Sequence, residues 1–419
     1  MKKIYLHLPV YLIVIFLMVN FSFFMQESRE NWNTTPKLST PTDSWQTTWD
    51  NNDFDRGSGI ALDSEDNIII GGTTGPGSHN SNNQILLLKY NSSSGGNLWN
   101  KTLHSGFDTI DLTLDSSNSI FIVGDDSMVV KFDSVGNYQW NVTANLGTIA
   151  EAAAITVDTG GNFYIVGTSG NPVRGIFVVK FDQTGVKQWE YVYHDSNNFI
   201  TGMDLALDSS NNIMAIGYAN VDKIILLKLS NSGNFLWNRT LEDYGIAFAI
   251  TLDSANNIYL SGSSQIRDLL LIKCDSSGIV QWTRTQHFTI YNWGFDIELD
   301  SMDNIYIAVD TQAGNDPDVV KYDSSGNYQG YGKSSEEINT PYPADIYDRM
   351  RCIAIDNSDS VYLGGSIIWD SYHDIKLVKN LVISIPSSPG IPSYNIFITV
   401  GLIAIISLVL VYRQKKLKK

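Results

Sequence analysis

Acidic and histidine side chains recur at fixed places along the 419-residue sequence. Three aspartates each lie four residues before another Asp that belongs to a repeated pattern: Asp111, Asp204 and Asp296. Three histidines each lie five residues after a repeated Trp: His104, His194 and His287. Because carboxylates and imidazoles ligate divalent metals, these six side chains are weak candidates for a cation site at the mouth of a central channel. Histidines on polar loops are commonly only solvated, so we assign no metal ligand, catalytic residue or cofactor.

The repeated pattern is an apolar-x-apolar-Asp sequence followed by a polar turn and a short β-rich run. Its aspartates are Asp63, Asp115, Asp158, Asp208, Asp253, Asp300 and Asp356. A Gly follows nine residues later in every unit except the sixth, where Val309 stands. Each unit therefore contains a strand, a tight turn and a second strand.

A third apolar run in each unit ends in a Lys, and a fourth carries a Trp. The lysines are Lys89, Lys131, Lys180, Lys228, Lys273, Lys321 and Lys379. The tryptophans are Trp99, Trp140, Trp189, Trp237 and Trp282, with Trp45 in an extra segment before the first unit. Gly330 replaces the Trp of the sixth unit, and the seventh unit has no Trp segment after Lys379.

Units of roughly 49 residues with four short strands are typical of β-propeller blades. The sequence therefore predicts an all-β, seven-bladed β-propeller over residues 43–383, with four antiparallel strands per blade. The Trp45 segment can supply the missing outer strand of the last blade. This pairing would close the ring and remove two exposed sheet edges.

Structural roles account for the recurrence of these residues. The repeat Asp can accept hydrogen bonds from turn amides, and we expect the Lys residues to pair with these carboxylates in a ladder between blades. The Trp rings can seal the gaps between neighbouring blades. Seven equivalent positions favour this interpretation over catalysis, calcium binding or stacking on sugars.

The repeat resembles a known family. The run Ala-Leu-Asp-Ser-x-x-Asn-Ile-Tyr-x-x-Gly, followed by Leu-Leu-Lys-Tyr-Asp-Ser-Ser-Gly-Asn and Trp-Asn, looks like the bacterial and archaeal SBBP β-propeller repeat and is similar to NHL-type blades. The resemblance covers roughly residues 43–380 and implies the fold, but it says little about a ligand.

The two ends of the chain predict attachment to a membrane. Residues 1–25, with Lys2 and Lys3 before an apolar run, are typical of a signal peptide or signal anchor, and residues 26–42 form a linker. A Pro/Ser-rich stalk (384–394), a transmembrane helix (395–412) and a basic cytoplasmic tail (413–419) follow the propeller. The plan is similar to prokaryotic C-terminal surface-sorting signals. We therefore expect the propeller on the extracytoplasmic side of the cell membrane.

Composition restricts the possible partners. The chain has 44 acidic and 28 basic residues, which gives a net charge of −16, so it should repel nucleic acid. Glycosylation sequons, which suit an exported protein, occur at Asn33, Asn91, Asn100, Asn141 and Asn238.

Three functions are compatible with these observations. The leading prediction is a non-enzymatic binding or scaffolding module that holds a protein or glycan on the face where connection lengths vary. The alternatives are an extracellular polymer hydrolase or lyase with its site at the channel mouth, and a structural component of the cell surface. No phosphate loop, paired-Cys motif or nucleophile elbow is present, so the sequence favours a protein that is not an enzyme.

Overall fold

The structure is a computed structural model that describes residues 43–383, apart from 52, 78–79, 147–149, 171–173, 196–198, 221, 290, 311–316, 334–346, 370–371 and 382. These residues all belong to the compact unit that begins at Asp43. The terminal segments predicted to be a signal, linker, stalk, membrane helix and basic tail lie outside the described residues. Within the described ranges, no helix is long and apolar enough to cross a membrane.

The described residues form β-strands joined by turns. Five antiparallel sheets have four strands each. Their strands are β6 (Thr109–Leu114), β7 (Ile120–Gly124), β8 (Met128–Phe132) and β9 (Tyr138–Thr143); β10 (Ala150–Val157), β11 (Phe163–Ser169), β12 (Gly175–Phe181) and β13 (Lys187–Tyr193); β14 (Ile200–Leu207), β15 (Ile213–Ala219), β16 (Lys223–Leu229) and β17 (Phe235–Glu242); β18 (Ile246–Leu252), β19 (Ile258–Ser263), β20 (Leu269–Cys274) and β21 (Val280–Gln286); β22 (Trp293–Leu299), β23 (Ile305–Asp310), β24 (Val319–Tyr322) and β25 (Tyr328–Gly332).

The remaining strands form one eight-stranded sheet. They are β1 (Trp45–Trp49), β2 (Phe54–Leu62), β3 (Ile68–Gly75), β4 (Gln84–Tyr90), β5 (Asn97–His104), β26 (Tyr347–Ile355), β27 (Val361–Trp369) and β28 (Tyr372–Lys379). β2 to β5 form one antiparallel group, and β26, β27, β28 and β1 form another. A single parallel pairing, Phe54 with His373, joins the two groups.

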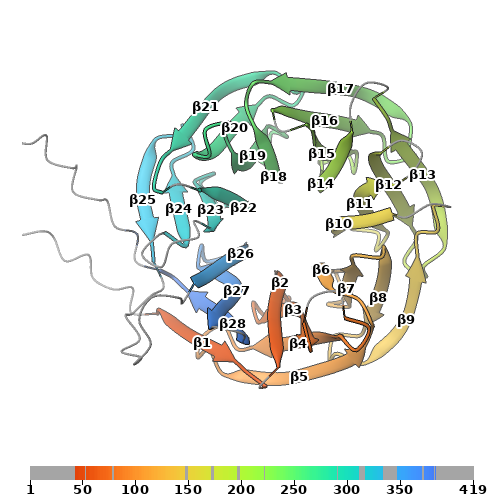
Figure 1. Cartoon of the computed structure of the whole chain (residues 1–419), viewed down its shortest axis with the longest axis vertical. Helices are drawn as coiled ribbons and strands as arrows, with labels where there is room; N and C mark the ends of the chain where they lie inside the picture. The colour runs from red at the N-terminus through yellow and green to blue at the C-terminus, as the bar shows by residue number, and fades with distance from the viewer. Residues whose placement is uncertain are drawn as a thin grey trace, which may run out of the picture. The chain divides into compact units, whose positions relative to one another are not determined.

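The sheets of this unit are arranged in a ring around a common centre (Figure 1). The first strand of each group is innermost, and these strands contact one another in the order β2, β6, β10, β14, β18, β22, β26 and back to β2. Apolar side chains fill the space between adjacent sheets, as where Val178 of β12 packs with Leu205 of β14. Second strands such as β3, β7 and β11 are buried along their whole length, which explains the apolar run with which each begins.

A β-bulge interrupts each innermost strand, five residues before the repeat Asp. The repeated Gly of the second strand lies opposite this bulge. At Gly217, an added Cβ would lie 2.3 Å from the backbone oxygen of Thr201, closer than any side chain can tolerate. The recurring Gly is therefore needed for close backbone approach.

The repeat aspartates organise the turn after the innermost strand, as the sequence predicts. Asp208 Oδ1 accepts the backbone N–H groups of Ser210 and Asn212, each at 2.9 Å. The same pair of bonds is made by Asp63, Asp115, Asp158, Asp253, Asp300 and Asp356. These carboxylates therefore have a structural role.

The lysine ladder forms, but within the sheets and not between them. Lys228 Nζ lies 2.8 Å from Asp208 Oδ2 of its own sheet, and Lys89 lies 2.5 Å from Asp63. Lys131, Lys180 and Lys273 pair in the same way. The predicted ladder between blades is wrong because the third strand runs beside the second, so its Lys reaches the turn of its own sheet. In the last two groups, Lys321 contacts the hydroxyl of Tyr306, and Lys379 pairs with Asp43.

The tryptophans do seal the contacts between neighbouring sheets. Each ring packs against a positive-φ Gly in the turn before the outermost strand of the next sheet, as Trp189 does against Gly233. The sixth unit needs no Trp because the last group has no hairpin turn there: β28 and β1 are distant in sequence. Leu381 and Ile383 follow β28 at this junction and pack close to Gly332, two residues beyond Gly330 on β25. Gly330 therefore lies at the one junction of the described ring where the next group has no turn glycine to receive a Trp ring.

Two turn glycines provide a matched test of this packing. Gly233 and Gly185 have similar φ values, +81° and +85°, but an added Cβ would lie 2.7 Å from the Trp189 ring in the first and 3.4 Å from Trp140 in the second. We expect Gly185→Ala to lower the free energy of unfolding by about 1 kcal/mol through backbone strain alone. Gly233→Ala should cost about 1–3 kcal/mol more, because the ring must move. Chemical denaturation of both variants measures the difference, and equal losses would contradict the packing account.

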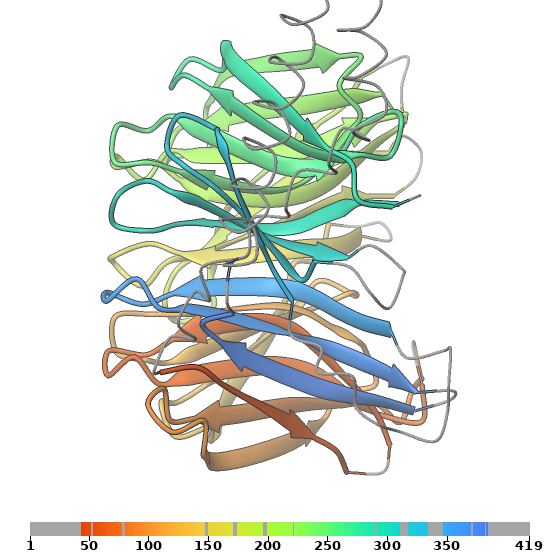
Figure 2. The same ribbon diagram turned by 90° about the vertical axis from the view of Figure 1, so that its left-hand side faces the viewer.

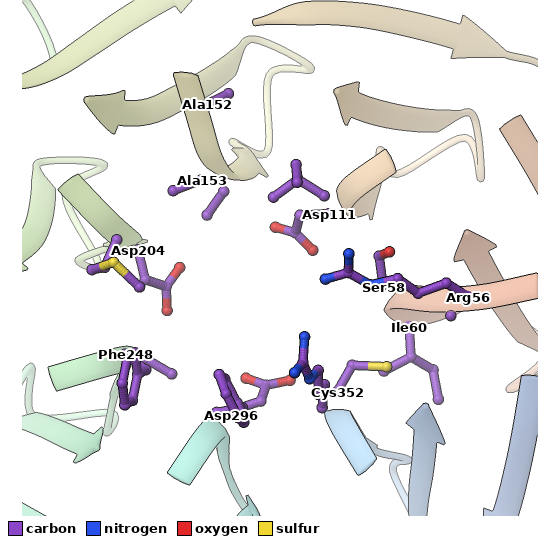
Figure 3. A pocket seen from close by; sticks show the side chains of 17 residues that line it. Arg56, Ser58, Ile60, Asp111, Ala152, Ala153, Asp204, Phe248, Asp296 and Cys352 are labelled. Carbon is purple, nitrogen blue, oxygen red and sulfur yellow. The ribbon is translucent and has the colours of Figure 1, made fainter. Parts of the chain in front are cut away.

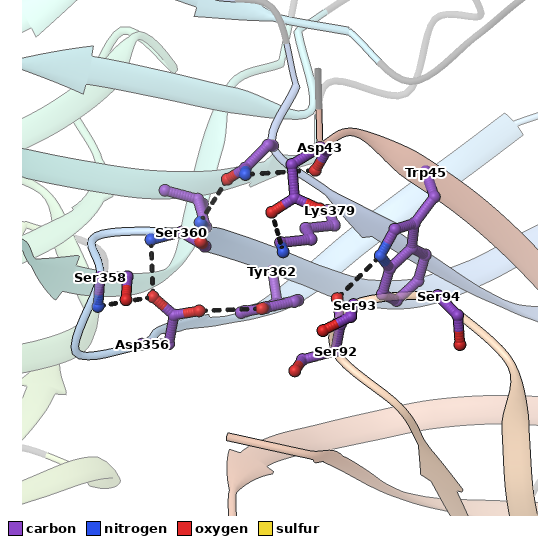
Figure 4. Close-up of polar contacts among 12 residues, drawn as sticks. Asp43, Trp45, Ser92, Ser93, Ser94, Asp356, Ser358, Ser360, Tyr362 and Lys379 are labelled. Carbon is purple, nitrogen blue, oxygen red and sulfur yellow. Dashed lines mark hydrogen bonds and ion pairs between the residues drawn. The ribbon is translucent and has the colours of Figure 1, made fainter. Parts of the chain in front are cut away.

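The extra N-terminal strand completes the last group, as predicted. β1 pairs antiparallel with β28 from Trp45–Lys379 to Trp49–Ile375. Figure 4 shows this junction, where Lys379 reaches Asp43 and the Trp45 Nε1 donates to the backbone oxygen of Ser92 at 2.9 Å. Trp45 thereby links the last group to the β4–β5 turn of the first. The first described strand, β1, is thus paired with the last, β28.

The connections lie on two sides of the ring. In an antiparallel four-stranded sheet, the turns from first to second and from third to fourth strand lie on one side, and Figure 2 shows tight turns gathered along one side of the unit. The connections from second to third strand and from one sheet to the next therefore lie on the other side, which we call the loop face. Each innermost strand begins at the loop face.

Candidate functional site

A cavity of about 360 Å³ lies at the centre of the ring, among the innermost strands. Figure 3 shows the carboxyl groups of Asp111, Asp204 and Asp296 pointing into this space from β6, β14 and β22. The guanidinium of Arg56 enters from β2, and the ring of Phe248 from β18. Arg351 and Phe295 also line the cavity, together with small and aliphatic residues. The structure thus brings the three aspartates of the candidate cation site to one cavity.

Each of these aspartates binds two backbone N–H groups. Asp111 Oδ1 accepts the N–H of Leu112 at 2.7 Å, and its Oδ2 accepts that of Ile155, on the neighbouring innermost strand β10, at 3.0 Å. Asp204 bonds Leu205 and Ile250 in the same way, and Asp296 bonds Ile297 and Ile353. Innermost strands are edge strands with unpaired backbone groups. The carboxyl groups satisfy two such groups each and connect adjacent sheets.

The aspartates occur on alternate strands for the same reason. The equivalent positions on the intervening strands hold small residues: Gly59, Ala154, Ala249 and Cys352. The carboxyl group of Asp111 on β6 already binds the backbone N–H of Ile155 on β10, so the equivalent position of β10 needs only a small residue that leaves room for this contact. At Gly59, an added Cβ would lie 3.0 Å from Asp111 Oδ1. The spacing of the three aspartates therefore has a packing origin.

Burial changes the acidity of these carboxyl groups. Burial raises the pKa of Asp111 to about 7 and that of Asp296 to about 6, although the bonds from backbone N–H groups act in the opposite direction. The pKa of Asp204 is also well above its ordinary value, through burial and the charges of Asp296 and Asp111. Glu298 lies two residues beyond Asp296 on β22, and burial followed by the Asp296 charge raises its pKa to about 8. Asp111, Asp296 and Glu298 therefore titrate near neutral pH.

This titration predicts a stability that falls as pH rises. The unfolded carboxyl groups ionise near pH 4, whereas the folded groups retain their protons to about pH 6–8. Between these values the folded state binds more protons, so the free energy of unfolding decreases with pH. His373, whose pKa burial lowers, opposes the trend below about pH 6.5. A tenfold change in one ionisation constant corresponds to about 1.4 kcal/mol. We therefore expect the free energy of unfolding to fall by at least about 1.4 kcal/mol between pH 5 and pH 8.

Denaturant unfolding of the protein at several values of pH measures this slope. The Asp111→Asn variant is the comparison, because an amide cannot ionise and its slope should be shallower. Unchanged or rising stability from pH 5 to pH 8 in the unsubstituted protein would show that the cavity carboxyl groups are ionised throughout.

Basic side chains occupy one part of the cavity wall and its loop-face end. Arg349 and Arg351 on β26 lie 3.7 and 3.5 Å from Asp310 Oδ2, and the Arg351 guanidinium lies 4.6 Å from the centre of the Phe295 ring. Burial lowers the pKa of both Arg56 and Arg351, and the charges of the other arginines add to this effect. Arg56 is attracted by Asp108 and Asp125. The guanidinium groups stay charged near neutral pH.

The histidines predicted to accompany the aspartates do not reach the cavity. His104 ends β5, and His194 and His287 follow β13 and β21, which are outermost strands. His287 Nδ1 lies 2.6 Å from Asp268 Oδ1. Within the described ranges, no group of three or more His, Cys, Asp or Glu side chains is placed to hold a metal ion. The structure therefore does not assemble the six candidate side chains into one site.

Several cavity residues were missed by the sequence reasoning. Arg351, Phe295 and Phe248 each lie five residues before the repeat Asp of their units, at the bulge, whereas Arg56 lies seven before it. Comparing the units column by column would have identified these positions. Their importance depends on the bulge, because it places the fifth residue before the Asp on the cavity wall.

The described glycosylation candidates differ in their surroundings. Asn100 and Asn141 are exposed on the outermost strands β5 and β9. Asn238 on β17 donates to the Tyr193 hydroxyl, and Asn91 accepts from the backbone N–H groups of Ser93 and Ser94. Asn33 lies outside the described residues. Glycosylation at these sites stays a prediction.

A ring of antiparallel sheets with short turns, an innermost strand per sheet and a central cavity defines a β-propeller-type repeat protein. The family model for the outer membrane protein assembly factor BamB matches residues 37–287. This match spans more than half of the chain, so the protein belongs to that family. The match confirms a propeller-type repeat, whereas the finer resemblance to the SBBP repeat stays a prediction.

No curated protein matches the chain. Among solved structures, the crystal structure of a protein of unknown function from Bacteroides caccae is similar, with 13% sequence identity and a TM-score of 0.45, over 62% of this chain and 91% of that one.

Proposed function

We propose that the protein is a membrane-anchored, extracytoplasmic β-propeller of seven blades that binds a ligand through its loop face and central cavity. The eight-stranded sheet is then two blades, because only the Phe54–His373 pairing joins its halves. The observation that carries the binding role is the cavity, in which carboxyl groups are held by backbone N–H groups and the guanidinium groups of Arg56 and Arg351 line one wall. Such fixed polar groups in an apolar wall are typical of ligand sites.

The large hydrophobic side chains exposed near the loop face offer a test of binding. Phe199 is 71% exposed before β14 and Ile266 is 77% exposed between β19 and β20, whereas Met302, 69% exposed, lies in a turn on the opposite side. We expect Phe199→Asp and Ile266→Asp to weaken binding to a glycan array or to purified cell-surface proteins by at least about tenfold, the effect of losing a well-packed contact. Met302→Asp should bind normally. Equal loss in all three variants would contradict a loop-face site.

The anchoring part of the proposal rests on the sequence of residues 395–412 and the basic residues that follow. The full-length chain should stay with membranes after alkaline carbonate extraction. A protease added to intact cells should digest the propeller and leave the C-terminal tail protected. Release by carbonate, or a protected propeller with a digested tail, would contradict the proposed location.

The raised pKa values of Asp111 and Asp296 favour a second candidate, a polymer hydrolase or lyase, because carboxyl groups that titrate near pH 6–7 suit general acid–base chemistry. Against it, both oxygens of each aspartate already bind backbone N–H groups. Product release from an extracellular polymer, lost in Asp204→Asn and kept in Met302→Asp, would support this enzyme.

A further inference from the structure

The two arginines that line the cavity lie on neighbouring strands, and one aspartate lies far from both. Arg56 is on β2 and Arg351 on β26, which contact each other in the ring. Asp111 and Asp296 are on the next strands, β6 and β22, on either side of this pair. Asp204 is on β14, three strands away from β2 in one direction and from β26 in the other. Figure 3 shows Asp204 and Arg56 entering from opposite sides.

The guanidinium groups have unused capacity to bind an anion. Arg351 Nε is buried without a hydrogen-bond partner among the described residues, as is Arg349 Nε. The ion pair of Arg351 with Asp310 is 3.5 Å long, and no ion pair within 4.0 Å links Arg56 to a described residue. An arginine cannot lose its charge to escape burial, so a bound anion that accepts from the unused N–H donors of these guanidinium groups would offset part of the cost of burying them.

The opposite wall can bind a cation. In Asp111, Asp204 and Asp296, each carboxyl oxygen accepts one hydrogen bond from a backbone N–H. A carboxylate can accept about four hydrogen bonds. Asp204 therefore keeps acceptor capacity toward the cavity. Its sequence neighbour Met203 and the nearby Phe248 and Ala249 are apolar. Asp204 forms no ion pair with a described cationic side chain, and it is the member of the three farthest along the ring from the strands of Arg56 and Arg351.

We propose that the cavity binds a small zwitterion whose carboxylate lies against Arg56 and Arg351, whose ammonium group lies against Asp204, and whose methylene chain contacts the apolar wall between them. This inference rests on the proposed binding function and names the ligand class for its central cavity. Charges of opposite sign on opposite walls favour a ligand with its two charges at opposite ends. An α-amino acid with adjacent charges fits this arrangement less well than an ω-amino acid or lysine.

A series of simple probes tests the proposal by calorimetry on the purified full-length chain in detergent. The probes are glycine, 4-aminobutyrate, 6-aminohexanoate and L-lysine, with hexanoate and hexylamine as analogues that each lack one charge. We expect 6-aminohexanoate to bind more tightly than glycine. Each half-analogue should bind about ten- to a hundredfold more weakly, because a charged hydrogen bond is worth about 1.5–3 kcal/mol.

Two variants test the contacts with the two ends of the ligand separately. Arg56→Gln should weaken 6-aminohexanoate and hexanoate alike, without affecting hexylamine. Asp204→Asn should reduce 6-aminohexanoate to the affinity of hexanoate. Arg174→Gln is the matched control, because Arg174 is an exposed arginine paired with Glu151 at 3.7 Å outside the cavity. Circular dichroism establishes folding, and if Asp204→Asn does not fold, the Arg56→Gln result decides alone.

Proton release provides a readout that a purely structural aspartate would not give. An ammonium group beside Asp204 favours its ionised form, so the binding heat of 6-aminohexanoate should depend on the ionisation enthalpy of the buffer. The zwitterion proposal is overturned if no probe binds at millimolar concentration, or if hexanoate or hexylamine binds as tightly as 6-aminohexanoate. That outcome leaves the proposed function to its own test, since the Phe199→Asp and Ile266→Asp variants probe larger ligands at the loop face.

Discussion

Trp45→Ala should lower the free energy of unfolding by about 3 kcal/mol, because removing a large packed aromatic from between elements costs about that much. The ring of Trp45 packs on Gly95 and its indole N–H binds the Ser92 oxygen, both in the turn between β4 and β5. Its strand, β1, is held by β28. Trp45 therefore connects the beginning and end of the described ring, where no short loop joins the neighbouring sheets.

Denaturant unfolding and limited proteolysis of the same samples measure this effect. We expect the variant to become sensitive to cleavage around residues 43–53 before the rest of the chain unfolds, because the closing strand detaches first. Leu98→Ala is the control: Leu98 is an apolar residue on an outermost strand that is 51% exposed, and its loss should cost less than about 0.5 kcal/mol. Comparable losses in the two variants would show that Trp45 does not hold the junction.

The repeat, the strand order and the closing strand could be predicted from the sequence because they depend on local patterns. Asp208 and its turn residues interact within five positions, and Gly217 marks a bulge in its own sheet. The Trp45 segment before the first unit was informative because the seventh unit lacks a Trp-bearing fourth strand after Lys379. Such patterns can be recognised in the sequence without knowledge of the surrounding fold.

The pairing of Lys228 and the exception at Gly330 could not be predicted as easily. A Lys at the end of a strand can reach a turn of its own sheet or of the next, and only the geometry of the sheets decides between them. Gly330 faces the junction where Leu381, which is distant in sequence, packs close to Gly332. Both cases depend on contacts between elements.

The candidate site was predicted in part for the same reason. Asp111, Asp204 and Asp296 share one sequence column, so their convergence follows from the symmetry of the repeat. The histidines share a column too, but that column lies at the end of the outermost strands. Arg56 and Arg351 occupy different columns and come together only because β2 and β26 are neighbours in the closed ring. A single repeat unit contains no information about that contact.

Asp111→Val should also have a large effect, about 3 kcal/mol, if the cavity carboxyl groups support the ring. The substitution leaves the N–H groups of Leu112 and Ile155 without their acceptors, and each buried unsatisfied N–H costs about 1–3 kcal/mol. Amide exchange at Ile155 should accelerate, because that N–H on β10 then has no partner. Thr113→Val, two residues further along β6, preserves side-chain shape and should be close to neutral.

Comparing Asp111→Val with Asp204→Val distinguishes the contribution of these aspartates to stability from their contribution to ligand binding. Asp204 makes the same two backbone bonds as Asp111, so a purely structural trio predicts similar losses of stability in both variants. Binding of 6-aminohexanoate should distinguish them, because the proposed ammonium contact belongs to Asp204 and not to Asp111. If the two variants lose stability equally and Asp111→Val alone loses the ligand, the cation end of the site lies beside β6, and the assignment of Asp204 is wrong.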